Sequence, residues 1–174
     1  MKLVSAGLLC ALSCFAQSPE PEFSDVFFRL DAGKLVPLER QTSSIQGKAS
    51  GFIVMNAKGV AILTGGKSPV RFRSEDALDF IVRSPLAASA ADPEALYCLR
   101  KLDAKKKQRE LVITTLHASP LGASTKRTAT TGLLPVTFSR YGNSSYKLST
   151  PPLPPGEYSV GRLYGQLVFC FGVD

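Results

Sequence analysis

The chain has 174 residues and a formal net charge of +7 at neutral pH, with no tryptophan and a single histidine. One histidine cannot build a metal site of several imidazoles, and a mildly basic charge is only weak evidence for an anionic partner. This length fits one domain that buries enough apolar surface to fold without a structural metal.

The first 16 residues have the composition of a secretory signal peptide. Lys2 supplies a positive charge, residues 3–15 form a largely apolar run without a charged side chain, and Ala16 precedes a polar segment. The run is shorter than the ~20 residues that span a bilayer, and no later segment is long enough either. We expect cleavage after Ala16, a soluble periplasmic or extracellular protein, and a disordered linker over residues 17–22.

Residues 11–14 also resemble a bacterial lipoprotein box, which would lipidate Cys14 and anchor the protein. The residue three before the cysteine is usually leucine in such boxes, and here it is Ala11. This difference favours plain secretion over lipidation.

The mature region alternates apolar and polar residues over short segments separated by turn signals, with almost no helical periodicity. Strands are predicted at 26–30, 34–40, 52–55, 60–63, 70–73, 78–83, 96–102, 110–116, 133–141, 146–148, 157–162 and 166–171. Their number and their spacing of about ten residues favour an immunoglobulin-like β-sandwich or a partly open barrel, formed by one domain over residues 23–174.

Turn residues refine this pattern. Pro37 places its strand at a sheet edge or bulge, because proline cannot donate to a ladder. Residues 56–59 read as the turn of a hairpin, and residues 120–131 as a loop rich in Gly, Ser and Thr. A short helical turn is expected near residues 92–94.

The hairpin predicted from residues 96–102 and 110–116 has a strongly basic tip. Its basic residues are Arg100, Lys101, Lys105, Lys106, Lys107 and Arg109. If they project together, they bind phosphate groups of anionic envelope lipids or glycans. No aromatic residues for base stacking are interleaved with them, so nucleic acid is not expected. The alternative is a solvated turn whose lysines prevent aggregation through the sheet edge.

Cys98 and Cys170 are the cysteines that remain after cleavage at Ala16. In an oxidising compartment they are candidates for a disulfide, which would close a loop of about 70 residues and contribute ~4 kcal/mol on the chain-entropy account. Two separate buried thiols are the alternative, because free cysteine is itself a small core residue. The sequence leaves both alternatives open.

Signals for catalysis are weak. Residues 64–68 resemble the end of a phosphate-binding loop, but Ala61 stands where that motif needs a glycine, and Pro69 follows instead of a helix. His117 would serve as the base of a small hydrolase, yet no Gly-x-Ser-x-Gly elbow accompanies it. We therefore expect a non-catalytic protein without a cofactor or a metal.

Residues 153–160, Leu-Pro-Pro-Gly-Glu-Tyr-Ser-Val, resemble the penultimate strand of prealbumin-like, carboxypeptidase-regulatory-like and other immunoglobulin-like bacterial modules. The mature chain is also similar to uncharacterised exported proteins of Gram-negative and acidobacterial type. That similarity lies in residues 26–28, 37–41, 67–72 and 169–174. The resemblance implies an immunoglobulin-like fold and carries over no functional residue. We expect an exported, non-catalytic binding or structural domain of the bacterial envelope.

Overall fold

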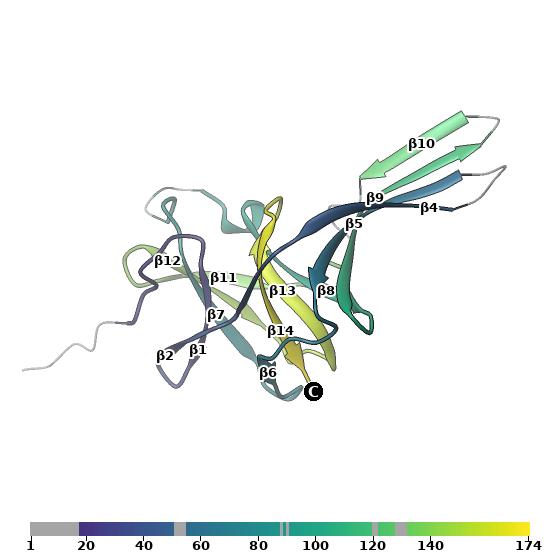
Figure 1. The fold of residues 1–174 in the computed structure, drawn as a ribbon. Helices are drawn as coiled ribbons and strands as arrows, with labels where there is room; N and C mark the ends of the chain where they lie inside the picture. The colour runs from purple at the N-terminus through teal and green to yellow at the C-terminus, as the bar shows by residue number, and fades with distance from the viewer. Residues whose placement is uncertain (1–17, 51–54, 88, 90, 120–121, 128–131) are drawn as a thin grey trace, which may run out of the picture.

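The computed structural model of the chain describes residues 18–50, 55–87, 89, 91–119, 122–127 and 132–174. Within these residues the chain forms fourteen strands and a short 3-10 turn at Pro93–Ala95, and no α-helix. The strands build two sheets, the larger of which curls into a half-barrel (Figure 1). The predicted all-β class, with a sandwich or partly open barrel of many short strands, is confirmed.

The smaller sheet has the strand order β11-β12-β7-β1-β2, and its neighbours are all antiparallel. Its strands are β1 (Phe27–Asp31), β2 (Lys34–Pro37), β7 (Leu78–Arg83), β11 (Thr137–Tyr141) and β12 (Ser145–Thr150). The strands predicted at residues 26–30 and 34–40 pair as the hairpin β1 and β2. Pro37 ends the edge strand β2, as predicted, so its missing N–H interrupts no interior ladder.

The larger sheet has the strand order β3-β14-β13-β8-β9-β5-β4, with β10 paired to β9 and β6 paired in parallel to β14. Its strands are β3 (Glu39–Thr42), β4 (Ser44–Ser50), β5 (Met55–Thr64), β6 (Arg71–Phe72), β8 (Tyr97–Ala104), β9 (Gln108–Ser119), β10 (Gly122–Arg127), β13 (Gly156–Arg162) and β14 (Leu167–Val173). The far halves of β5 and β9, together with β4 and β10, leave the body as an extended arm (Figure 1).

An apolar core fills the space between the two sheets. Phe171 of β14 lies within it, with the ring centroids of Phe72, Phe80 and Tyr158 at 5.5, 5.1 and 5.6 Å. Such aromatic pairs contribute ~0.5–1.5 kcal/mol each beyond the burial of their area. Because Phe80 belongs to the smaller sheet and Tyr158 to the larger, Phe171 joins the two layers.

The hairpin predicted around residues 56–59 is wrong. These residues continue β5, which pairs with β4 on one side and with β9 on the other. The register to β9 shifts between Gly59 and Val60 because Ile113 of β9 has no opposite residue, so this glycine lies opposite a β-bulge and forms no turn. Residues 52–54 of that prediction lie outside the described residues.

Two other segments differ from their predicted form. The strand predicted over residues 34–40 is divided at Leu38, a core residue at which the chain passes from the smaller sheet to the larger. The loop predicted over residues 120–131 contains β10, whose pairing with β9 supplies the ladder that its polar composition did not suggest. The remainder of that loop, residues 120–121 and 128–131, lies outside the described residues.

The predicted signal peptide, residues 1–16, lies outside the described residues, and so does Cys14. In the part of the chain that the structure describes, no helix has the length and hydrophobicity required to cross a membrane. Residues 18–22 of the predicted linker run alongside the turn that leads into β12.

Glu20 ties this N-terminal segment to the domain. Its carboxylate accepts hydrogen bonds from the backbone N–H groups of Asn143 and Ser144 at 2.8 and 3.0 Å, and from the hydroxyls of Ser144 and Ser145 at 2.8 and 2.6 Å. Partial desolvation acts to raise the pKa of Glu20, but these four bonds outweigh it and lower the pKa to about 2. Glu20 is therefore part of the fold rather than of a disordered linker.

We expect Glu20→Gln to lower the thermal unfolding midpoint at pH 7 by a few degrees. The folded pKa lies below the unfolded one, so the ionised carboxylate stabilises the fold above about pH 4.5, and this contribution disappears as the pH falls toward about 2. Circular dichroism melts at pH 7 and about pH 3 should therefore show a smaller difference in acid. Glu22→Gln, at an exposed position, is the control. An equal difference at both pH values contradicts the role given to the carboxylate.

Candidate binding groove

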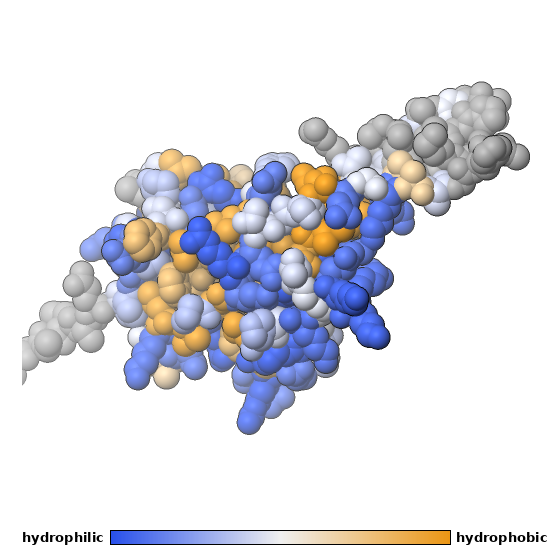
Figure 2. Space-filling view, viewed as in Figure 1, coloured by the Kyte–Doolittle hydropathy of each residue, from blue (hydrophilic) through white to orange (hydrophobic). Residues whose placement is uncertain are grey.

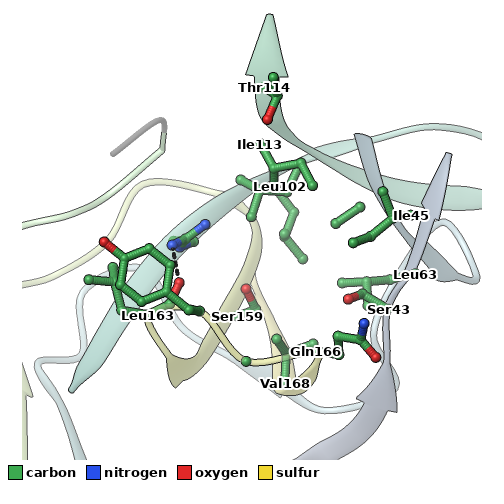
Figure 3. Close-up of a pocket in the computed structure, with 15 residues that line it drawn as sticks. Ser43, Ile45, Leu63, Leu102, Ile113, Thr114, Ser159, Leu163, Gln166 and Val168 are labelled. Atoms are coloured by element: carbon green, nitrogen blue, oxygen red, sulfur yellow. Dashed lines mark hydrogen bonds between the residues drawn. The ribbon is translucent and has the colours of Figure 1, made fainter. Parts of the chain in front are cut away.

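A cavity of about 350 Å³ opens on the concave face of the larger sheet, where the arm leaves the body. We call it the groove. Strands β4, β5 and β9 form one side of it, and β8, β13, β14 and the connection between β13 and β14 form the other (Figure 3). Figure 2 shows hydrophobic residues at the base of the arm, bordered by hydrophilic ones.

The walls of the groove are mainly apolar. They include Leu63, Leu102, Leu111, Ile113, Leu163 and Val168. Successive side chains of a strand point to opposite faces, so the spacing of Leu111 and Ile113 along β9 places both on the concave side. The same alternation along β8 directs Arg100 and Leu102 into the groove.

Two polar side chains lie together on this apolar surface. Arg100 of β8 and Ser159 of β13 are directly opposite in the antiparallel register, and both line the groove. Arg100 is only 7% exposed and Ser159 only 3%. Nη2 of Arg100 donates to the carbonyl of Leu163 at 2.7 Å (Figure 3, dashed line), and Nε donates to Sγ of Cys98 at 3.2 Å.

The positive charge of Arg100 has no counter-charge nearby. Among the described residues no Asp or Glu oxygen lies within 4.0 Å of its guanidinium nitrogens. Burial raises the pKa of the Cys98 thiol more than Arg100 lowers it, so this acceptor is neutral at pH 7. The hydroxyl of Ser159 likewise has no hydrogen-bond partner in the described part of the chain. Buried charges in proteins are normally paired, so Arg100 is an exception.

Arg109, a second buried arginine, has its charge paired within the protein. At the start of β9 it is fully buried, and its Nη1 and Nη2 donate to the two carboxylate oxygens of Glu39 at 2.7 and 2.9 Å. Nη2 and Nε also donate to the carbonyls of Thr64 and Gly65 at 2.9 and 3.0 Å. A second carboxylate, that of Glu157, lies 3.6 Å from Nη1.

Glu157 extends this cluster to the C-terminus. It is 4% exposed, accepts a hydrogen bond from the backbone N–H of Ser68 at 2.8 Å, and pairs with Arg71, which in turn pairs with Asp174. Burial acts to raise the pKa of Glu39, but its hydrogen bonds to Arg109 and to polar neighbours lower the pKa overall. Glu39 is therefore ionised at neutral pH, and its pairing with Arg109 holds β3 against β9.

The six basic residues predicted to form a binding tip do not project together. Lys105, Lys106 and Lys107 are exposed in the turn between β8 and β9, and Lys101 is exposed on β8. The two arginines of the set are buried, as described above. The reason is that β8 and β9 pair at only two positions next to the turn and then separate. Beyond these positions β8 pairs with β13, and β9 pairs with β5. Because side chains alternate along each strand, Arg100 and Arg109 face the interior of the curled sheet, whereas Lys101 faces outward.

Ser159 was not identified from the sequence, and Arg100 was assigned to the wrong surface. The alternation of side chains along residues 98–102 could have indicated that Arg100 is buried, because Cys98, Arg100 and Leu102 share one face of the strand. An arginine between two apolar residues of one face is a candidate for burial. Its opposition to Ser159 depends on the strand order, which the sequence does not reveal.

His117 lies within β9, where its backbone is opposite Asn56 of β5 and Ser124 of β10. The strand predicted over residues 110–116 is therefore longer than expected and includes His117. Across the described ranges, no group of three or more His, Cys, Asp or Glu residues is placed to hold a metal ion.

Cys98 and Cys170 are both buried and both free. Cys98 lies opposite Gly161 of β13, whereas Cys170 lies opposite Ser159 on the other side of the same strand. A complete strand separates them, so their Cα atoms are two strand spacings (~10 Å) apart across the sheet, with a further offset of two residues along it. A disulfide requires less than ~7 Å. The disulfide alternative is wrong, and the alternative of two separate buried thiols is correct.

Comparison with known proteins gives no relative: no family model matches the chain, and no curated protein or solved structure is significantly similar to it.

We expect both thiols to resist iodoacetamide in the folded protein at about pH 8 and to react fully in denaturant without reductant. Burial raises the pKa of Cys98 and raises that of Cys170 to about 12, so little thiolate is present while the protein is folded. Intact mass spectrometry counts the added groups. A denatured chain that takes up none, about two daltons lighter than the reduced chain, would contradict the separation of the cysteines.

We expect Arg109→Met to destabilise the protein by about 3 kcal/mol, because it leaves the carboxylates of Glu39 and Glu157 without their buried partner. Urea denaturation followed by circular dichroism measures this loss. Arg40→Met, at an exposed position of β3, is the matched control and should change stability little. Equal effects of the two substitutions would show that the buried pair does not hold the strands together.

Proposed function

We propose that the mature chain is an exported, non-catalytic binding domain of the bacterial envelope, and that the groove is its binding site. The observation that carries the proposal is a mainly apolar cavity of about 350 Å³ whose lining includes two buried polar side chains on adjacent strands, Arg100 and Ser159. Ligand pockets are mainly apolar cavities of ~300–1,000 Å³ with a few placed polar groups. Export is supported by the signal-peptide composition of residues 1–16.

The surroundings of Ser159 favour binding over acyl transfer. A nucleophilic serine needs a neighbouring base that accepts its proton. The residues opposite Ser159 on the adjacent strands are Arg100 and Cys170. A guanidinium accepts no proton, and the pKa of Cys170 is raised to about 12, which keeps that thiol protonated.

The groove is a stronger candidate than the basic turn. Residues 105–107 are the exposed part of the turn between β8 and β9, and within it Nζ of Lys105 pairs with the carboxylate of Asp103 at 2.6 Å. Exposed ion pairs contribute little and are screened by salt. The groove instead offers apolar walls and buried polar groups, which together account for both affinity and orientation.

We expect the protein to bind the neutral fluorophore N-phenyl-1-naphthylamine, whose emission rises in apolar surroundings. Ala61 lies on the wall of the groove and is 9% exposed, so Ala61→Phe should fill the cavity and weaken binding by about tenfold. Ala95→Phe makes the same change at an exposed position of the 3-10 turn.

Fluorescence titration of the three proteins tests the site. Loss of affinity only in Ala61→Phe supports the groove. Absence of binding by the wild type, or equal affinity in all three proteins, removes the groove as the binding site.

A further inference from the structure

We propose that the groove selects an acidic amphiphile, a molecule with an apolar chain and one anionic headgroup, and that Arg100 and Ser159 together hold this headgroup. The inference rests on the function proposed above and specifies the ligand class. It follows from the charge, the geometry and the walls of the groove.

The two buried arginines of the larger sheet differ in their counter-charges. Arg109 is held by Glu39 and lies close to Glu157, so its charge is balanced within the protein. Arg100 is 7% exposed, and within the described residues it makes hydrogen bonds only to a backbone carbonyl and a neutral thiol. Nη1 of Arg100 has no hydrogen-bond partner in the described residues and is not fully buried, so it faces the open groove, where a charge among apolar walls is unfavourable without a counter-ion. An anionic ligand supplies the missing counter-charge and removes this cost.

The donors that remain on Arg100 suit an oxyanion. A guanidinium has five N–H groups, and the bonds to Cys98 and Leu163 occupy one on Nε and one on Nη2. Both N–H groups of Nη1 and one of Nη2 therefore have no acceptor in the described part of the chain. A carboxylate or phosphate binds this edge of arginine through two parallel hydrogen bonds.

Ser159 reaches the same headgroup. Directly opposite residues of an antiparallel pair have Cβ atoms only ~4.5–5.5 Å apart, and Ser159 is directly opposite Arg100. Its hydroxyl belongs to the groove lining (Figure 3), and it can donate to the oxyanion that the guanidinium binds. The two side chains thus form one polar site on an apolar surface.

The remainder of the groove suits an apolar chain. Leu63, Leu102 and Val168 face the cavity from β5, β8 and β14, and Ile45 lies at its edge with 59% of its surface exposed (Figure 3). Tyr164, also on the lining, is 82% exposed. A hydrocarbon chain that extends from Arg100 along these walls would cover apolar surface that is now open to water.

The charge of Arg100 also predicts what the groove rejects. A neutral alcohol of equal chain length leaves the guanidinium without a counter-charge, and an amine adds a second positive charge beside it. The expected order of affinity is acid first, then alcohol, then amine.

Displacement of N-phenyl-1-naphthylamine by decanoic acid, decanol and decylamine tests this order. We expect decanoic acid to bind about tenfold or more tightly than decanol at pH 7, because a charge-assisted bond to a buried arginine has no equivalent in the alcohol. Arg100→Met should remove the preference, and Ser159→Ala should reduce it. Lys101→Met changes the neighbouring residue, which is exposed, and should leave the preference intact.

The outcomes separate the two proposals. If the fluorophore binds but acid and alcohol displace it equally, the headgroup site is wrong and the apolar binding site stands. If the fluorophore does not bind, both proposals fail. Should Arg100→Met fail to fold, Arg100→Lys replaces it: the ammonium keeps the charge, so a reduced preference for the acid supports the inference, whereas an unchanged or abolished preference contradicts it.

Discussion

The ion pair between Arg109 and Glu39 closes the curl of the larger sheet. In the strand order, Arg109 of β9 is four strands away from Glu39 of β3, yet the two side chains meet through two hydrogen bonds. A second link lies beside it, where the side chain of Gln41 bonds to both the N–H and the carbonyl of Thr64 at the end of β5. A flat sheet could not make these contacts, so the concave face on which the groove opens depends on them.

The groove lies on this concave face. The surroundings of its arginine differ from those of Arg109, whose ion pair closes the curl of the sheet. Arg109 is surrounded by carboxylates and backbone carbonyls, as a structural buried charge must be. Arg100 lies on the same face in β8, but among the residues that the structure describes its side chain contacts only neutral acceptors and mainly apolar walls. The fold thus balances one buried arginine internally and leaves the other available to a ligand from outside.

Local sequence signals predicted the local structure well. The run of Phe80, Ile81 and Val82 is fully buried within β7, and Pro37 occupies a sheet edge, because β propensity and the lack of a proline N–H act at the residue itself. Gly59 shows the limit of such signals, since glycine fits opposite a bulge as well as in a turn. Only the partner strand distinguishes these two uses.

Features that depend on strand order were not predictable from the sequence. Cys98 and Cys170 resemble a disulfide pair until β13 is found between them. The basic residues around the β8–β9 turn resemble one exposed patch until those strands separate and direct Arg100 and Arg109 inward. Burial and opposition across strands follow from the tertiary arrangement, and the proposed site depends on both.

A crystal structure of the protein with bound decanoic acid tests the central claim most directly. We expect the carboxylate to lie within hydrogen-bond distance of both the guanidinium of Arg100 and the hydroxyl of Ser159, with the alkyl chain along Leu102 and Val168. A ligand bound outside the groove, or inside it with its carboxylate turned away from Arg100 toward solvent, would contradict the account.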